Sequence, residues 1–522
     1  MSFVSDLDTP LLQLSPRDVF TLRDACNGGV HVFGSPGSGK TSGSGQTLAG
    51  AYLRAGMGGL VLAAKPEDIP LWMGYAKKHG RQQSVVVFDE AQGFNFIAYE
   101  LARQGLKAAS NVTECLMRVL ESADSTTGNT GAATDPFWPQ AMRQALNYSV
   151  PVIYAAYGNV TVSDIIDFVV TAATKAEQYN DPEWDSYAAR TLRKVVKHPA
   201  VAMDADVQRA MLEFWFQQWP AIPAKTRGNI VISLSTRLDR FKHGRLRQCF
   251  CDRTTLVPEM TFQGAIIIMA MPVLTWNEDG IIGQQLFKFM WQRAVESRNG
   301  LDECQQTRPV FLWADEAQYF VSVKDDEFLS TCRGSRAAVV FLTQTLPTYY
   351  ARLGKDKSDA ADGLVGKFAT QVFHQNACGR TNEFASKLIG RALQRRRSES
   401  ESRGTSQSRG MNAGANTSAG ESSSFGHSRG GQQSSFNSNS GSNHSSGNSW
   451  GDNVGQGTSE NSTTGYCEQN DFIVEPRFFA SKLKSGGPSN RNLVTAVWFK
   501  AGGNFADGDG GNFLLPTFRQ PS

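Results

Sequence analysis

The strongest chemical signal in the sequence is one run of eight residues. They are Gly34, Ser35, Pro36, Gly37, Ser38, Gly39, Lys40 and Thr41. The run fits the pattern G-x-x-x-x-G-K-[ST] at every position, and such glycines let backbone N–H groups converge on phosphate oxygens. In a loop of this kind the lysine reaches the β- and γ-phosphates and the threonine hydroxyl binds Mg²⁺. The run therefore predicts a P-loop for ATP and Mg²⁺, with Lys40 catalytic and Thr41 a metal ligand.

A P-loop needs an acidic partner at the end of a neighbouring strand, and two Asp-Glu pairs compete for that role. Asp89-Glu90 follows the apolar run 85–88, and Asp315-Glu316 follows the apolar run 310–314. The second pair is favoured because a further apolar run comes next and ends in a polar Thr-Gln-Thr tip. This order suits RecA-like motors.

The same order assigns a role to three side chains. We predict that Asp315 joins the Mg²⁺ shell, that Glu316 activates water and that Gln344 senses the γ-phosphate or the attacking water. The loop between the two strands offers Arg333 as an arginine that completes a neighbour's site, with Arg336 as the second choice. A solvated basic loop is the alternative for both arginines.

Short apolar runs that alternate with helical patterns surround these residues and predict an α/β fold. We expect a RecA-like P-loop NTPase domain with a mostly parallel central sheet, an inserted all-α domain and a disordered Ser/Gly/Asn-rich insertion. The predicted segments are 1–100, the first part of the nucleotide-binding domain; 101–227, all-α; 228–397, its second part; 398–465, the insertion; and 466–522, its C-terminal part.

Composition limits the classes of function. Lys and Arg number 52 against 49 Asp and Glu, so no global positive charge favours nucleic acid, and any DNA contact needs a local patch. Two basic runs are candidates for such a patch, 237–247 and 395–397. The eight cysteines show no metal-binding spacing, and no apolar run reaches the length of a membrane span.

Several motifs occur together in an order that resembles the TraG/TraD family of type IV secretion coupling proteins, within the HerA/FtsK superfamily of P-loop ATPases. They are the P-loop, the phrase Gly59–Glu67, the Asp315-Glu316 strand, the block Arg333–Gln344 and Lys387–Gly390. The resemblance implies a homo-hexamer that moves DNA toward a secretion channel, and it places Arg333 at the family's arginine finger.

The resemblance also implies partners, namely DNA, a relaxase or secreted-substrate protein, and the membrane channel components of a secretion system. Two departures matter. The family's usual pair of N-terminal transmembrane helices has no counterpart in this sequence, so we expect a cytoplasmic protein that either reaches the inner membrane through a partner or acts in the cytosol. The phrase Ala63-Ala64-Lys65-Pro66 lacks the Asp that many members carry there, which leaves the role of Lys65 open.

The sequence thus favours a ring-shaped ATPase that couples DNA or nucleoprotein to a conjugation channel and drives its translocation. One alternative is a motor of the same fold that powers protein secretion or pilus assembly without DNA. Another is a non-catalytic adaptor that binds ATP and recruits substrates, although Lys40, Asp315, Glu316 and Gln344 together argue against it.

Overall fold

The computed structural model describes residues 2–126, 137–181, 183–353, 358–410, 418–430, 433–445 and 453–520. The chain divides into two units. The first comprises Met1–Asn382 with Phe479–Ser522, and the second comprises Glu383–Phe478.

A nine-stranded sheet forms the centre of the first unit, in the order β16-β15-β9-β3-β8-β7-β4-β6-β5. Its strands are β3 (Val30–Phe33), β4 (Gly58–Leu62), β5 (Val85–Phe88), β6 (Ile266–Met269), β7 (Val310–Ala314), β8 (Ala337–Thr343), β9 (Thr370–Phe373), β15 (Val497–Lys500) and β16 (Phe513–Leu514). The seven strands from β9 to β5 are parallel to one another, and β15 runs antiparallel to both of its neighbours. The predicted fold class is confirmed.

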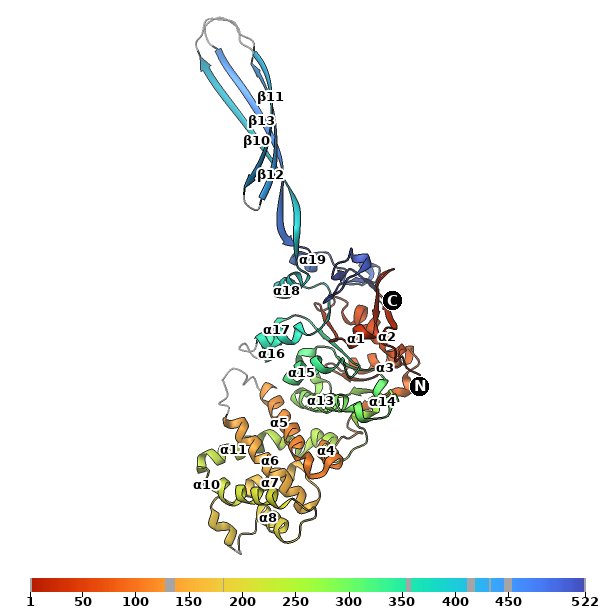
Figure 1. Ribbon diagram of the computed structural model, residues 1–522, viewed down its shortest axis with the longest axis vertical. Coiled ribbons are helices and arrows are strands. Elements are labelled where there is room, and N and C mark those ends of the chain that lie inside the picture. Colours follow the sequence, from red (N-terminus) through yellow and green to blue (C-terminus); the bar gives the residue numbers. More distant parts are fainter. Residues whose placement is uncertain are drawn as a thin grey trace. The chain divides into compact units, whose positions relative to one another are not determined.

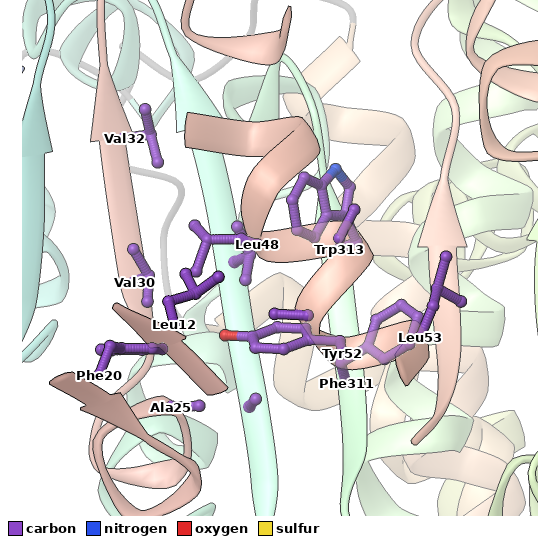
Figure 2. Close-up of a cluster of buried hydrophobic side chains, with 14 of the residues drawn as sticks. Leu12, Phe20, Ala25, Val30, Val32, Leu48, Tyr52, Leu53, Phe311 and Trp313 are labelled. Atoms are coloured by element: carbon purple, nitrogen blue, oxygen red, sulfur yellow. The ribbon is translucent and has the colours of Figure 1, made fainter. Parts of the chain in front are cut away.

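Continuous apolar runs form these strands because both faces of the sheet are covered. Every residue of β3, β4, β6, β7, β8 and β9 is buried. On one face, α2 (Gln46–Arg54) packs Leu48 and Tyr52 against the sheet, near Val32, Phe311 and Trp313 (Figure 2). This core fixes the helix that follows the P-loop.

Helices account for most of the remaining first unit (Figure 1). Besides α2 they are α1 (Leu22–Cys26), α3 (Asp68–Lys78), α4 (Phe96–Gln104), α5 (Ala109–Thr126), α6 (Phe137–Tyr157), α7 (Val162–Thr171), α8 (Tyr187–Lys197), α9 (Ala205–Glu213), α10 (Trp219–Ala221), α11 (Ala224–Leu238), α12 (Gly244–Phe250), α13 (Val273–Glu296), α14 (Glu303–Thr307), α15 (Val323–Thr331), α16 (Pro347–Leu353), α17 (Ser358–Gly366) and α19 (Pro476–Ser481). The last of these begins in the second unit and ends in the first, while α18 (Gly379–Ile389) begins in the first unit and ends in the second.

The described residues between β5 and β6 form helices and turns, with no strand. Capping boxes and side-chain caps start several of these helices; Thr161, for example, caps α7 with Asp164. The helical stretch continues past the predicted boundary at residue 227, because α11 spans it.

Two continuous apolar runs do not form single strands. In the run Leu364–Phe373, α17 extends to Gly366 and β9 begins only at Thr370. The run Val494–Phe499 divides between β14 (Leu493–Thr495) and β15, since β14 pairs instead with β17 (Thr517–Arg519). Apolar character alone does not separate a buried helix end from a strand.

A short hairpin precedes the sheet, formed by β1 (Pro10–Gln13) and β2 (Val19–Thr21). The described residues of the second unit include four strands in and around the insertion that was predicted to be disordered. They are β10 (Arg391–Gly410), β11 (Ser418–Gly430), β12 (Gln433–Ser445) and β13 (Asn453–Phe472). β10 pairs with β13 and β11 with β12, all antiparallel. Antiparallel ladders of this kind pair backbone N–H and C=O groups with one another, which a polar sequence can do as well as an apolar one.

Among the described helices, none is by itself long and apolar enough to cross a membrane. Only α6 and α7 taken together reach that length and hydropathy, and the pair is bent by 110°.

The strand that leads into the P-loop contains a titratable residue, His31, whose neutral form the fold requires. His31 is fully buried, and its Nε2 is hydrogen-bonded to the Tyr349 hydroxyl at 2.8 Å. Burial lowers the pKa of His31 to about 3. Below its unfolded pKa of about 6.5 the unfolded chain takes up a proton that the native state does not, so stability falls as the pH drops toward 3.

We expect His31→Gln to flatten the acid dependence of stability. Between about pH 6 and pH 4 the unfolding free energy of the variant should fall less steeply than that of the wild type, by roughly 1.4 kcal/mol per pH unit. Urea denaturation across this range measures the slope. Tyr349→Phe is the control because it removes the same hydrogen bond and keeps the imidazole, so its slope should match the wild type. An unchanged slope in His31→Gln would contradict the assignment.

Candidate nucleotide-binding site

The P-loop lies at the carboxyl end of β3, where the chain turns sharply before α2. Gly37 and Gly39 have φ angles of 74° and 83°, a left-handed conformation that residues with a side chain rarely adopt. The loop is anchored at its start by Gly34 N–H, which donates to Thr343 O at 3.2 Å, and by Ser35 N–H, which donates to Gln375 O at 3.0 Å.

The loop backbone is suited to an anion. Within the described residues, the N–H groups of Gly37, Gly39 and Lys40 donate no hydrogen bond. Unpaired N–H groups in a turn that precedes a helix form a concave site for phosphate oxygens. The Ser38 hydroxyl is also buried, without a hydrogen-bond partner in the described structure. These features fit a polyphosphate.

The predicted acidic pair lies beside the P-loop. Thr41 Oγ1 donates to Asp315 Oδ2 at 2.8 Å, and both atoms are oxygens of the kind that Mg²⁺ prefers. Glu316 follows with a φ of 50°, and its N–H donates to Asp315 Oδ1 at 2.9 Å. Because of this left-handed turn, the successive carboxylates of Asp315 and Glu316 have different contacts. The donor set fits a bound Mg²⁺.

Glu316 is the most heavily bonded carboxylate at the site. Its Oε1 lies 4.0 Å from Lys40 Nζ and 3.2 Å from Lys65 Nζ. Gln344 Nε2 donates to both oxygens, at 3.1 and 3.3 Å, and Gln318 Nε2 donates to Oε2 at 2.9 Å. Burial alone would raise the pKa of Glu316, but these hydrogen bonds and the two ammonium charges hold it below the usual value. The side chain is therefore kept ionised.

The order of the strands in the sheet explains why these side chains meet at Glu316. β8 lies between β3 and β7, so Gln344, after β8, falls between the P-loop and the acidic pair. β4 pairs with β7 on the side away from β8, and Lys65 follows β4 in the chain. The backbone N–H groups of Ala64 and Lys65 both donate to Asp68 Oδ2. Burial raises the pKa of Asp68 to about 6, against the lowering effect of these bonds.

The rejected acidic pair lies elsewhere. Asp89 and Glu90 follow β5, the edge strand, and five inter-strand steps separate β5 from β3. At about 4.8 Å per step these residues are roughly 24 Å from the P-loop strand. Glu90 forms an ion pair with Arg245 at 2.9 Å.

Arg333 lies at the opposite edge of the sheet from the P-loop. It is exposed and precedes the N-terminal end of β8, while Gln344 follows the carboxyl end of that strand. Seven strand residues between them place Arg333 more than roughly 20 Å from the site of its own chain. Arg336 differs, because its guanidinium donates to Ser5 O at 2.6 Å and to Thr307 O at 3.2 Å.

The basic run 237–247 is largely neutralised by carboxylates. Arg240 pairs with Glu278 and Asp279, Lys242 with Asp167, Arg245 with Glu90, and Arg247 with Asp252. All of these partners except Asp252 come from distant parts of the sequence, and the run therefore presents little of the free positive charge that phosphate contact requires. The side chains of the second run, 395–397, lie outside the described residues.

Three residues near the P-loop were not identified from the sequence. His374 is fully buried, with Nε2 hydrogen-bonded to Ser44 Oγ at 2.7 Å, and burial with the Lys40 charge lowers the pKa of His374 to about 3. Asn376 Nδ2 donates to Gln344 O at 2.8 Å, and Gln318 joins Glu316 to the hydroxyl of Thr343. Only Gln318, two residues after Glu316, could have been found by its spacing.

A buried ion pair supports the segment that follows Glu316. Lys288 of α13 pairs with Asp325 and donates to Phe320 O at 2.6 Å. Asp325 also caps α15, accepting hydrogen bonds from the N–H and hydroxyl of Ser322. The pair therefore ties the loop after the acidic strand to the helical layer.

Strand order and the position of the loop define a RecA-like P-loop fold. Comparison with known proteins agrees. Residues 309–449 match the family model described as the TraM recognition site of TraD and TraG. Among curated proteins, none matches the sequence.

Three solved structures of the plasmid coupling protein TrwB share the fold at 13% sequence identity. The complex with GDPNP has a TM-score of 0.52 and covers 96% of this chain and 86% of that chain. The complex with ADPNP has a TM-score of 0.51, with 100% and 90% covered, and the complex with ADP and Mg²⁺ a TM-score of 0.50, with 96% and 86% covered. The predicted resemblance to TraG/TraD-type coupling proteins is confirmed by the family model and by this fold.

We expect Lys288→Met to destabilise the protein by about 3–5 kcal/mol, because it leaves the Asp325 carboxylate buried without a counter-charge. Denaturant titration of the full chain measures the loss. The double variant Lys288→Met with Asp325→Asn should recover more than half of it, since asparagine is neutral and still accepts the capping hydrogen bond. A double variant no more stable than Lys288→Met would disprove this account.

Proposed function

We propose that this protein is an ATPase that works as a ring and couples a DNA or nucleoprotein substrate to a conjugation or type IV secretion channel. The proposal rests mainly on the side chains that contact Glu316. A buried carboxylate kept ionised by Lys40, Lys65 and Gln344, next to a P-loop, is arranged to act on water at a γ-phosphate.

Each residue of the site has a part in this reaction. The P-loop N–H groups and Lys40 bind the β- and γ-phosphates, and Thr41 with Asp315 holds Mg²⁺, which neutralises charge on the phosphates. Glu316 accepts a proton from the attacking water. Gln344 stays within reach of both that water and Glu316 and reports the γ-phosphate.

Arg333 is proposed to act in a neighbouring subunit. It is exposed and too far from the P-loop of its own chain to reach the phosphates, so its role requires an adjacent copy. A guanidinium supplied across an interface stabilises the charge that develops in phosphoryl transfer. This requirement supports a closed ring, for which we propose a homo-hexamer.

The substrate and partners follow from the family resemblance. The matched model names TraM recognition, so we propose that residues 309–449 include a surface for a protein of the transfer complex. Relaxase or secreted-substrate protein and membrane channel components remain proposed partners, with attachment at the inner membrane through one of them. DNA contact cannot rest on run 237–247, whose charges are paired, so another surface must supply it.

The action of Arg333 across an interface can be tested by mixing two inactive variants. We expect Lys40→Ala to abolish turnover and Arg333→Ala to lower kcat by about 10³-fold. In an equal mixture that exchanges subunits, about one interface in four carries both intact residues, so activity should recover to roughly a quarter of the wild type. Steady-state phosphate release measures it.

Each variant assayed alone at the same total concentration is the control for this mixture. A mixture no more active than the two variants separately would show that Arg333 does not complete a neighbour's site. Wild-type activity should also rise more steeply than in proportion to protein concentration while the ring assembles.

Lys65 provides a test of Glu316 as the base. Removing the ammonium in Lys65→Met raises the pKa of Glu316, because one of its two neighbouring positive charges is lost. The acid limb of the kcat profile should therefore move to higher pH, so that the variant loses more activity at about pH 6 than at about pH 8. Lys65→Arg keeps the charge and should leave the profile in place. A shift in neither variant would exclude Glu316 as the titrating base.

The motor that secretes protein without DNA is separated from the proposed function by ATPase assays with single- and double-stranded DNA. Stimulation that disappears as salt rises favours nucleic acid, because phosphate contacts release counterions. Hydrolysis indifferent to DNA favours protein secretion or pilus assembly. ATP binding without hydrolysis at any concentration favours the recruiting adaptor.

A further inference from the structure

The turn that follows the P-loop is not a regular α-helix. Thr41–Gly45 form a π-helical turn before α2 begins, in which Gly45 N–H donates to Lys40 O at 2.8 Å. Such turns are rare and are frequently found at functional sites. Ser42 lies in this turn directly after the proposed Mg²⁺ ligand Thr41, so its position affects the phosphate-binding N–H groups.

A two-stranded sheet of β14 and β17 packs on this turn. The two strands pair antiparallel, and Val494 of β14 is fully buried. A methyl group added at Gly39 would lie 2.6 Å from Val494 Cγ2, and one added at Gly43 would lie 3.1 Å from Val494 Cγ1. Gly39 of the P-loop and Gly43 of the turn therefore leave room for the β14–β17 pair.

Gln520, which follows β17, joins the β14–β17 pair to the P-loop turn through its side-chain amide. Its Nε2 donates to Ser42 Oγ at 2.6 Å, and its Oε1 accepts from Gly487 N–H at 2.9 Å. Its backbone N–H donates to Asn492 O at 2.8 Å. The two side-chain bonds hold the amide in one orientation, and the backbone bond holds residue 520 beside β14, so Gln520 adds a fixed side-chain partner for Ser42.

We propose that Gln520 is a positioning residue for nucleotide binding, which acts by holding Ser42 and with it the P-loop backbone around Thr41. The inference rests on the proposed function, because it assigns a role in the same nucleotide site. Gln520 itself touches none of the atoms proposed to react. The residues that shape the nucleotide site then come from two parts of the chain, the P-loop and the segment 493–520 that contains β14 and β17.

A double-mutant cycle on the full chain tests the proposal, with a fluorescent ATP analogue and Mg²⁺ as the probe. Gln520→Ala and Ser42→Ala should each weaken binding by about 5-fold, the effect of one lost hydrogen bond. Because both changes break the same contact, the double variant should also lose about 5-fold, and not the roughly 25-fold of two independent losses.

Thr517→Ala is the matched control, since Thr517 is exposed on β17, three residues before Gln520, and makes no hydrogen bond to Ser42 in the described part of the chain. It should bind the analogue as the wild type does. A thermal-unfolding midpoint recorded for every variant separates positioning from a general loss of stability, and Gln520→Asn tests whether a shorter amide restores binding.

Lys40→Ala separates this proposal from the proposed function. If Lys40→Ala loses binding while Gln520→Ala and Ser42→Ala keep wild-type affinity, the positioning role is overturned and the nucleotide site stands. Independent, multiplying losses in the double variant would also overturn it. If Lys40→Ala binds as tightly as the wild type, the nucleotide site itself is wrong, and the role of Gln520 falls with it.

Discussion

One buried negative charge organises the centre of this protein. The Glu316 carboxylate is almost inaccessible to water, and an ion in that position is costly unless cations and hydrogen-bond donors surround it. No single segment could supply them. Lys40, Lys65 and Gln344 each follow a different strand, and they meet because β3, β8, β7 and β4 are adjacent in the sheet. The proposed chemistry therefore depends on the order of the strands, and the helices packed on the sheet stabilise that order.

The contacts of Glu316 also indicate how a bound γ-phosphate would act on it. Lys40 and Lys65 both lie beside Glu316, and Gln344 and Gln318 complete its hydrogen bonds. A γ-phosphate is a stronger attraction for Lys40 than a carboxylate at 4.0 Å, so its binding would draw one cation away. Glu316 would then have a lone pair available for water.

How far the sequence predicts this site depends on the range of each interaction. The P-loop is local, and a strand-loop-helix context suffices to recognise it, while Asp315-Glu316 and Gln344 were found because each follows an apolar strand. Lys65, His374 and Gln520 are near the P-loop only through sheet register and packing, which no local pattern encodes. The ion pairs of run 237–247 could not be read from the sequence for the same reason, since most of the carboxylates in them come from helices and loops far away in sequence.

Chain connectivity adds a constraint that neither the motif nor the sheet alone contains. The P-loop is held at its start by the segment after β9, where Gln375 O accepts from Ser35 N–H, and at its end by Gln520 through Ser42. These two supports lie on either side of the 391–472 strands in the sequence. A ligand that shifted either flank would alter the P-loop, and by linkage a bound nucleotide would change the affinity of that ligand by the same factor.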